Sequence, residues 1–114
     1  MARRKTGPDR ATVELLFERS HERCERCGSR GEQIHHRKPR KSGGTRDAAI
    51  NDLSNLVLLC QADHHYVEMN REWAYEQGWL VRSWADPAYQ PVRIQGSWIR
   101  LSEVYTLVDL DWRV

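Results

Sequence analysis

The alternation of apolar and polar positions predicts two helices in this chain. An apolar face between Val13 and Phe17, set among charged positions, predicts a helix over about residues 11–22. Residues 61–77 also repeat apolar positions at helical spacing, and Gly78 follows as the residue type that most often ends a helix. The sequence therefore places one helix near its start and a second one in its middle.

Short apolar segments elsewhere predict strands. Residues 32–36 alternate in character, and residues 50–60 begin polar and end in the apolar run LVLLC, as expected for a buried strand. Between them, residues 37–49 hold a proline, two glycines and five basic side chains, which predicts a positively charged loop. Residues 79–114 contain short apolar pieces interrupted by proline and glycine, which predicts a β-rich tail. The expected fold class is α+β.

The length of 114 residues suits one domain. Residues 1–8 are polar and basic and end in Gly-Pro, which predicts a flexible arm in front of a single domain over residues 9–114. No run of ~18 apolar residues occurs, so no membrane contact is expected. The first residues lack the apolar stretch of a signal peptide, and the expected location is the cytoplasm. The oligomeric state is left open.

The formal net charge of +2 conceals an uneven distribution. Residues 1–46 carry 13 Lys and Arg against 6 Asp and Glu, whereas residues 47–114 carry 5 against 10. A basic half predicts a polyanionic partner, most often a nucleic acid. The alternative is that these cations only solvate exposed helices.

The three cysteines argue against a closed disulfide framework and for a metal site. Cys24 and Cys27 are spaced to place two thiolates on one turn, as a tetrahedral zinc ion requires, and Cys60 is a natural third ligand. A fourth ligand can come from the residues just after Cys60, namely Asp63, His64 and His65. The alternative is a redox pair with Cys60 as a small buried side chain, but no thioredoxin-like strand and helix surround the pair.

Two pairs of adjacent histidines, His35-His36 and His64-His65, flank this zinc knuckle. In a strand, neighbouring side chains point to opposite faces, so His35 and His36 can do different work. One imidazole can bind a metal ion while the other accepts a proton from water, which is the division that a hydrolytic site needs.

The order of these features resembles the HNH endonuclease family, and more narrowly its small phage-type members with a cysteine-bound zinc. The features are Cys24-x-x-Cys27, His35-His36, the Ser42-Gly43-Gly44 loop, the run from Asn55 to Cys60, and Asp63-His64. The resemblance covers about residues 20–80. The segment from Gly78 to Pro87 is also similar to the end of HNH proteins from actinobacterial phages, as part of a C-terminal extension over residues 79–114.

The resemblance implies a ββα-metal (His-Me finger) module, in which two strands joined by the basic loop precede a helix and one catalytic divalent ion lies between them. It implies that His35 and His64 bind this ion and that His36 is the general base. Asn55 would be the middle residue of the motif, which holds the loop that orients His36 through hydrogen bonds to the backbone. The ion could be Mg²⁺, Mn²⁺, Ni²⁺ or Zn²⁺.

The zinc site departs from the family, which usually has four cysteines. The position of the fourth cysteine is occupied by Asp63, so an ungapped alignment makes Asp63 a zinc ligand and leaves His64 for catalysis. Three alternatives remain: His65 supplies the fourth ligand, the zinc site is weakened, or a one-residue slip gives His64 to zinc and His65 to the catalytic ion.

The resemblance implies a metal-dependent endonuclease that cuts double-stranded DNA, with a phage origin and work beside terminase in DNA packaging. The alternative is a non-catalytic, zinc-stabilised DNA-binding module. Five cations after His36 are expected to contact DNA phosphates, namely Arg37, Lys38, Arg40, Lys41 and Arg46. The tryptophans are expected to pack in the core and tail rather than to stack on bases, namely Trp73, Trp79, Trp84, Trp98 and Trp112.

Overall fold

The computed structural model describes residues 7–39, 48–109 and 112 and has mixed helix and sheet, which confirms the α+β class. The helices are α1 (Arg10–Ser20), α2 (Gln61–Met69) and α3 (Arg71–Gln77). The strands are β1 (Gln33–His36), β2 (Leu56–Leu59), β3 (Val92–Ile94), β4 (Ser97–Leu101) and β5 (Tyr105–Leu107). Short 3₁₀ turns occupy Ala48–Asn51, Leu53–Asn55 and Pro87–Tyr89. No helix within the described ranges is long and apolar enough to cross a membrane.

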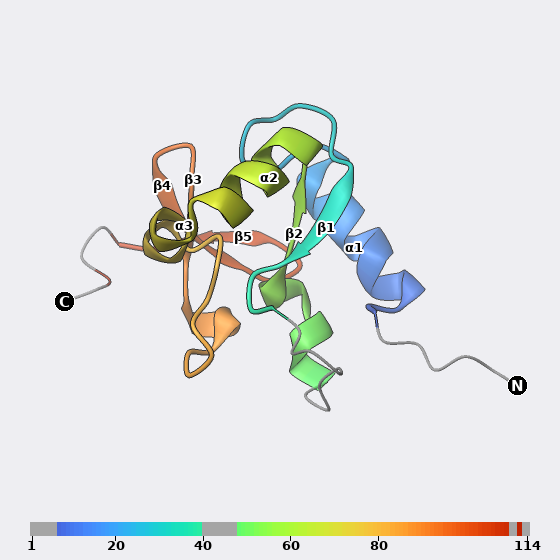
Figure 1. The fold of residues 1–114 in the computed structure, drawn as a ribbon. Coiled ribbons are helices and arrows are strands. Elements are labelled where there is room, and N and C mark those ends of the chain that lie inside the picture. The colour runs from blue at the N-terminus through green and yellow to red at the C-terminus, as the bar shows by residue number, and fades with distance from the viewer. Residues whose placement is uncertain (1–6, 40–47, 110–111, 113–114) are drawn as a thin grey trace, which may run out of the picture.

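The strands β1 and β2 form an antiparallel ribbon that lies between α1 and α2 (Figure 1). The two faces of β2 enter different parts of the core: Leu56 and Leu58 pack with Leu16 of α1, whereas Val57 and Leu59 pack with Val67 of α2. Both faces are therefore buried, which explains why this strand is apolar at every position. The expected strand over residues 50–60 is shorter than predicted, because 3₁₀ turns fill residues 48–55.

The register of the ribbon gives the two histidines of β1 different surroundings. His35 lies opposite Val57, and His36 lies opposite Leu56. Directly opposed residues share a face of the sheet, so His35 belongs to the face that α2 covers and His36 to the opposite face. The expectation that the pair points in two directions agrees with this register.

The expected helix over residues 61–77 is wrong in one respect, because it breaks at Asn70. The backbone of Asn70 has φ −128° and ψ 58°, which is outside the helical region, and its N–H donates to the Tyr66 carbonyl to end α2. The new direction lets Ala74 of α3 enter the core. Gly78 ends α3 at φ 86°, where a Cβ would lie 2.2 Å from the Pro91 carbonyl oxygen, so glycine is required there.

The C-terminal part is β-rich as predicted, with a three-stranded antiparallel sheet in the order β3-β4-β5. Trp79 and Trp98 are buried, in agreement with the expected packing role. For Trp84 that expectation is wrong, because 82% of its surface is exposed. It lies in the irregular segment between α3 and the Pro87–Tyr89 turn, outside the helices and strands.

A buried ion pair fastens this C-terminal sheet to the cysteine knuckle. Arg19 of α1 binds both carboxylate oxygens of Glu25 at 2.9 and 3.1 Å, and the two side chains are almost fully buried. The Tyr105 hydroxyl of β5 donates to the same carboxylate at 2.7 Å, and Arg19 also donates to the Ser102 carbonyl. Burial, followed by the charge of Glu25, raises the pKa of Tyr105. The pair therefore orders the knuckle, α1 and β5 relative to one another.

Candidate active site and metal centres

Three cysteines and one aspartate converge between the knuckle and the start of α2. Their candidate ligand atoms, from Cys24, Cys27, Cys60 and Asp63, all lie within 4.8 Å of one another. Cys24 Sγ is 3.1 Å from Asp63 Oδ2, and Cys27 Sγ is 3.8 Å from Cys60 Sγ. Two sulfurs bound tetrahedrally to zinc at about 2.3 Å are about 3.8 Å apart, so the spacing suits a single zinc ion.

The electrostatics of this group fit a cation at its centre. Burial raises the pKa of the Cys24 thiol to about 12, so a positive ion is needed to make it a thiolate at neutral pH. Burial also acts to raise the pKa of Cys60, but hydrogen bonds, first from the Asp63 N–H, outweigh it and lower that pKa. For the Asp63 carboxyl the balance is similar, since hydrogen bonds from Cys27, Cys24 and Arg26 outweigh burial and lower its pKa.

The group contains Asp63 and excludes His65, the alternative ligand. Asp63 is buried on the first turn of α2, while His65 is exposed and lines an open pocket on another side of the helix. The Asp63 carboxylate oxygen that does not contact Cys24, Oδ1, accepts a hydrogen bond from Arg26 at 2.5 Å. The Arg26 guanidinium also lies over the rings of Tyr66 and Trp73, 4.7 and 4.9 Å from their centroids. Arg26 was missed by sequence reasoning, which had no signal for its partners.

A second group of candidate ligands joins β1 to α2. The ligand atoms of His35, His64 and Glu68 lie within 4.8 Å of one another. The His35 and His64 rings meet edge to face at 5.2 Å, and His35 Nδ1 is 3.9 Å from Glu68 Oε1. His64 and Glu68 line an open pocket, so the group can be reached from solvent. Two imidazoles and a carboxylate around an open position are a common donor set for a divalent first-row ion.

The surroundings of His35 prepare one nitrogen for a metal ion. Its Nε2 is 2.8 Å from the Trp79 carbonyl oxygen, which can only accept, so Nε2 carries the proton and Nδ1 keeps its lone pair. Burial lowers the pKa of His35 to about 4, which keeps the ring neutral near pH 7. His64 is arranged in the same way, since its Nδ1 contacts the Gln33 side-chain oxygen and its Nε2 is left for a ligand role.

Glu68 was not singled out from the sequence, although a signal was present. It follows His64 by four residues, and side chains four apart in a helix lie on the same face. Once His64 is taken as a ligand on a helix, Glu68 is the next acidic side chain along that face. Arg71 holds the other oxygen of this carboxylate at 2.9 Å.

His36, the expected general base, is the last residue of β1 and is half-buried. Its Nε2 is 2.9 Å from the side-chain oxygen of Asn51, so Nε2 donates its proton there and Nδ1 remains a proton acceptor. His36 lies on the opposite face of the ribbon from His35, yet close enough for its charge to help lower the pKa of His35. Asn51 was missed because it belongs to a 3₁₀ turn that the sequence placed in a strand.

Residues 24–67 match the family model described as HNH endonuclease. The matched HNH segment begins at the first knuckle cysteine and contains His35, His36, Asn55 and His64. The resemblance to the HNH endonuclease family is thereby confirmed for this segment, and the family suggests nuclease activity on DNA with a divalent metal. No curated protein and no solved structure matches the chain.

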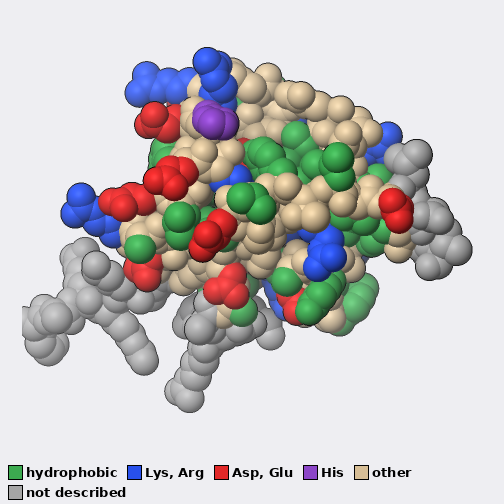
Figure 2. Space-filling model, turned by 180° about the vertical axis from the view of Figure 1, so that it is seen from behind, with side chains coloured by type: hydrophobic (Ala, Val, Ile, Leu, Met, Phe, Trp, Pro, Cys, Tyr) green, Lys and Arg blue, Asp and Glu red, His purple; other side chains and the backbone are tan. Residues whose placement is uncertain are grey.

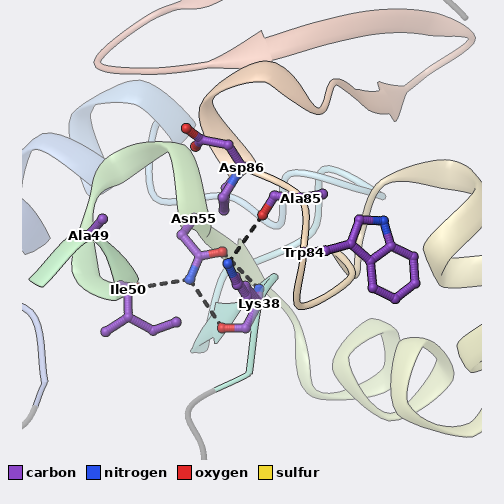
Figure 3. A pocket seen from close by; sticks show the side chains of 8 residues that line it. Lys38, Ala49, Ile50, Asn55, Trp84, Ala85 and Asp86 are labelled. Carbon is purple, nitrogen blue, oxygen red and sulfur yellow. Dashed lines mark hydrogen bonds between the residues drawn. The ribbon is translucent and has the colours of Figure 1, made fainter. Parts of the chain in front are cut away.

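Asn55 of the HNH segment is fully buried and joins the two ends of the loop between β1 and β2 (Figure 3). Its side-chain oxygen accepts from the Lys38 N–H at 2.7 Å. Its amide nitrogen donates to the carbonyls of Ile50 at 2.8 Å and Lys38 at 3.2 Å. Since Lys38 follows His36 by two residues, these bonds fix the backbone on which His36 is carried.

One expected DNA contact of the HNH segment is wrong. Arg37 has no exposed surface, and its guanidinium donates to four backbone carbonyls, those of Ser54, Gly78, Pro87 and Gln90. It therefore fastens β1 to the later part of the chain and cannot reach a phosphate. Lys38 is half-exposed and donates to the Ala85 carbonyl at 3.2 Å. The other expected contacts, Arg40, Lys41 and Arg46, lie outside the described residues.

The surface seen from behind carries separate acidic and basic side chains (Figure 2). Acidic side chains gather there on the side of α1, and hydrophobic ones lie toward the C-terminal sheet. The described residues of this face form no continuous basic surface. A DNA-binding surface is therefore expected on the side that carries β1, α2 and the loop after His36.

Proposed function

We propose that this chain is a metal-dependent HNH endonuclease that hydrolyses phosphodiester bonds of double-stranded DNA. The observation that carries the proposal is the convergence of His35, His64 and Glu68, with the free nitrogen of His35 set by the Trp79 carbonyl. The position of α2 against the β1–β2 ribbon supports a ββα-metal arrangement. His36 lies directly beside this group in the sequence.

Each residue of the site has a distinct task in this proposal. His35, His64 and Glu68 would hold the divalent ion. A bound ion would neutralise the charge that develops on the phosphate and stabilise the departing 3′ oxygen. His36 accepts the proton of the attacking water at Nδ1, and Asn51 keeps its Nε2 protonated. Asn55 keeps the Lys38 backbone, and with it His36, in place.

The knuckle is proposed to hold a structural zinc ion on Cys24, Cys27, Cys60 and Asp63. Such an ion contributes on the order of 10 kcal/mol to folding in small zinc domains. The knuckle also carries Glu25, which anchors Arg19 and Tyr105, so zinc at this point would order the C-terminal sheet as well. A single domain over residues 9–114 fits these links. The phage origin and the terminase partner rest on the sequence resemblance alone, and co-purification with a terminase subunit tests the latter.

A plasmid assay tests the catalytic proposal. The purified chain with Mg²⁺, Mn²⁺ or Ni²⁺ should convert supercoiled DNA to nicked or linear forms, and His36→Ala should abolish the conversion. His65→Ala is the matched control, because that histidine is exposed and outside both ligand groups. Cleavage by His36→Ala at the parental rate would refute the assignment of the base. DNA binding without cleavage by the parent under all three metals would instead favour the non-catalytic binding module.

A further inference from the structure

Trp84 is a large aromatic residue on the surface and is 82% exposed. The Arg82 guanidinium lies 6.0 Å from the indole centroid, stacks on the Tyr75 ring at 3.7 Å, and binds the Glu72 carboxylate at 3.0 and 3.2 Å. The cation beside Trp84 is thus fixed by two partners of its own. A single exposed aromatic side chain is common, so a ligand is inferred only from what lies beside Trp84.

Trp84 is one of the residues that line a pocket of about 250 Å³. Figure 3 shows Lys38, Asn55 and Ala85 joined through hydrogen bonds, with the Trp84 indole extending outward to one side of them. Ile50 and Pro87 add apolar walls. The volume is below the roughly 300–1,000 Å³ of sites that enclose whole small molecules, so it suits one ring of a larger ligand.

The pocket is continuous with the loop that carries the proposed general base. Lys38 follows His36 by two residues, and Ile50 precedes Asn51, the partner of the His36 imidazole. Asn55 connects the pocket to the loop that carries His36, because it lines the pocket and also binds the Lys38 backbone. A ligand in this pocket would therefore lie next to the position proposed for the bond that is cut.

The charges around the pocket select the orientation of such a ligand. The Lys38 ammonium uses one of its three donors on the Ala85 carbonyl, which leaves donors for a phosphate. Asp86 also lines the pocket and would repel a phosphate placed beside its carboxylate, although it can accept from an exocyclic amine. The phosphate is therefore expected on the Lys38 side and a flat aromatic ring on the Trp84 side.

We propose that Trp84 is a stacking platform for one unpaired nucleobase of the DNA substrate, with the adjoining phosphate on Lys38. The inference rests on the proposed function only in taking DNA as the substrate. A base inside an intact duplex has both faces covered by its neighbours, so the platform favours strand ends, gaps or distorted sites. The protein then binds DNA with an unpaired nucleotide more tightly than a continuous duplex.

Binding of labelled oligonucleotides without added divalent metal tests this proposal separately from cleavage. The zinc-loaded chain is titrated into a single strand, the matching duplex, and a duplex with one unpaired nucleotide, and anisotropy is measured. Stacking on an aromatic side chain is worth about 1–3 kcal/mol per base, so Trp84→Ala should weaken single-strand binding by about 5- to 150-fold and leave the duplex nearly unchanged. Trp84→Phe keeps an aromatic face and should retain most of the affinity.

Tyr89→Ala is the matched control, because Tyr89 is 68% exposed and has Arg100 at 5.4 Å from its ring but does not line the pocket. Equal single-strand binding by Trp84→Ala and the parent would overturn the proposal, and so would an equal loss in Trp84→Ala and Tyr89→Ala. If the chain never cuts plasmid but prefers DNA with an unpaired nucleotide in a Trp84-dependent way, the proposed nuclease activity is refuted and the stacking role of Trp84 is supported. If the chain cuts plasmid but shows no such preference, the stacking role is refuted and the nuclease activity is supported.

Discussion

The pair between Arg26 and Asp63 should govern how tightly the knuckle binds zinc. Asp63 directs one carboxylate oxygen toward Cys24 at 3.1 Å, and Arg26 holds the other oxygen at 2.5 Å. If zinc binds to the first oxygen, Arg26 keeps the carboxylate monodentate and offsets part of the negative charge of three thiolates and a carboxylate. The perturbation is Arg26→Ala, which removes this partner and leaves all four candidate ligands in place.

The expected size of the effect follows from the burial of the pair. The Arg26 side chain is 31% exposed and that of Asp63 is 10% exposed, so water replaces the lost contact only in part. Loss of a partner that orients a metal ligand commonly reduces metal affinity by about 10- to 100-fold. That range corresponds to about 1.4–2.7 kcal/mol. We expect Arg26→Ala to lie in it, with the loss of its packing on Tyr66 and Trp73 included.

Competition with a chromophoric zinc chelator measures the affinity, and Co²⁺ absorption reports whether the site stays tetrahedral. Arg93→Ala is the control, since Arg93 also lies over a tryptophan, at 5.4 Å from Trp98, but is a member of neither ligand group. Asp63→Cys removes the carboxylate, so the additional Arg26→Ala change should then cost little. Parental zinc affinity in Arg26→Ala, or an equal loss in the Asp63→Cys background, would refute the reasoning.

Three further changes test other parts of the molecule. Glu68→Ala should weaken binding of the catalytic ion by more than about tenfold in calorimetry, while Glu76→Ala on α3 should not. Arg37→Lys should lower the free energy of unfolding by about 3 kcal/mol or more in urea denaturation, because an ammonium cannot serve four carbonyls in the geometry of a guanidinium. His35 has its pKa lowered by burial from an ordinary 6.5 to about 4, so the folded state binds fewer protons than the unfolded chain between these values. With zinc in the knuckle and no second ion, the free energy of unfolding should therefore fall by about 3 kcal/mol as the pH drops from 6.5 to 4, and His35→Gln should remove this slope.

Local patterns were sufficient to predict the parts of the fold that depend on neighbouring residues. The apolar run from Leu56 to Leu59 indicated a buried strand, and the cysteine and histidine spacings indicated two groups of ligands on the segment now matched to the HNH family. The break at Asn70 was not predictable in this way. Residues 61–77 keep helical spacing on both sides of it, and the direction of α3 is decided by where Ala74 and Trp79 find the core.

The burial of charged and aromatic side chains could not be predicted from composition. Arg37 and Lys38 are adjacent cations in a basic stretch, yet Arg37 is enclosed by carbonyls from three later segments of the chain and Lys38 faces a pocket. Trp79 and Trp84 likewise differ by five positions, and one is buried while the other is 82% exposed. In each case the outcome depends on which distant backbone passes nearby, and this information is absent from the local sequence.

The candidate catalytic centre depends on chain that lies beyond the matched segment. The match ends at residue 67, but the carbonyl that fixes the proton on His35 belongs to Trp79, and the Val81 N–H donates to the Arg37 carbonyl at 2.8 Å. Trp79 reaches His35 because α3 turns back at Asn70 and ends at Gly78, where only glycine fits against Pro91. A ligand nitrogen on β1 is thus prepared by a residue 44 positions later. Changes in residues 70–81 should alter metal binding at His35 even though none of these residues is a candidate ligand. Metal titration of variants in this turn can show whether a residue affects the ion by positioning His35 rather than by binding the ion itself.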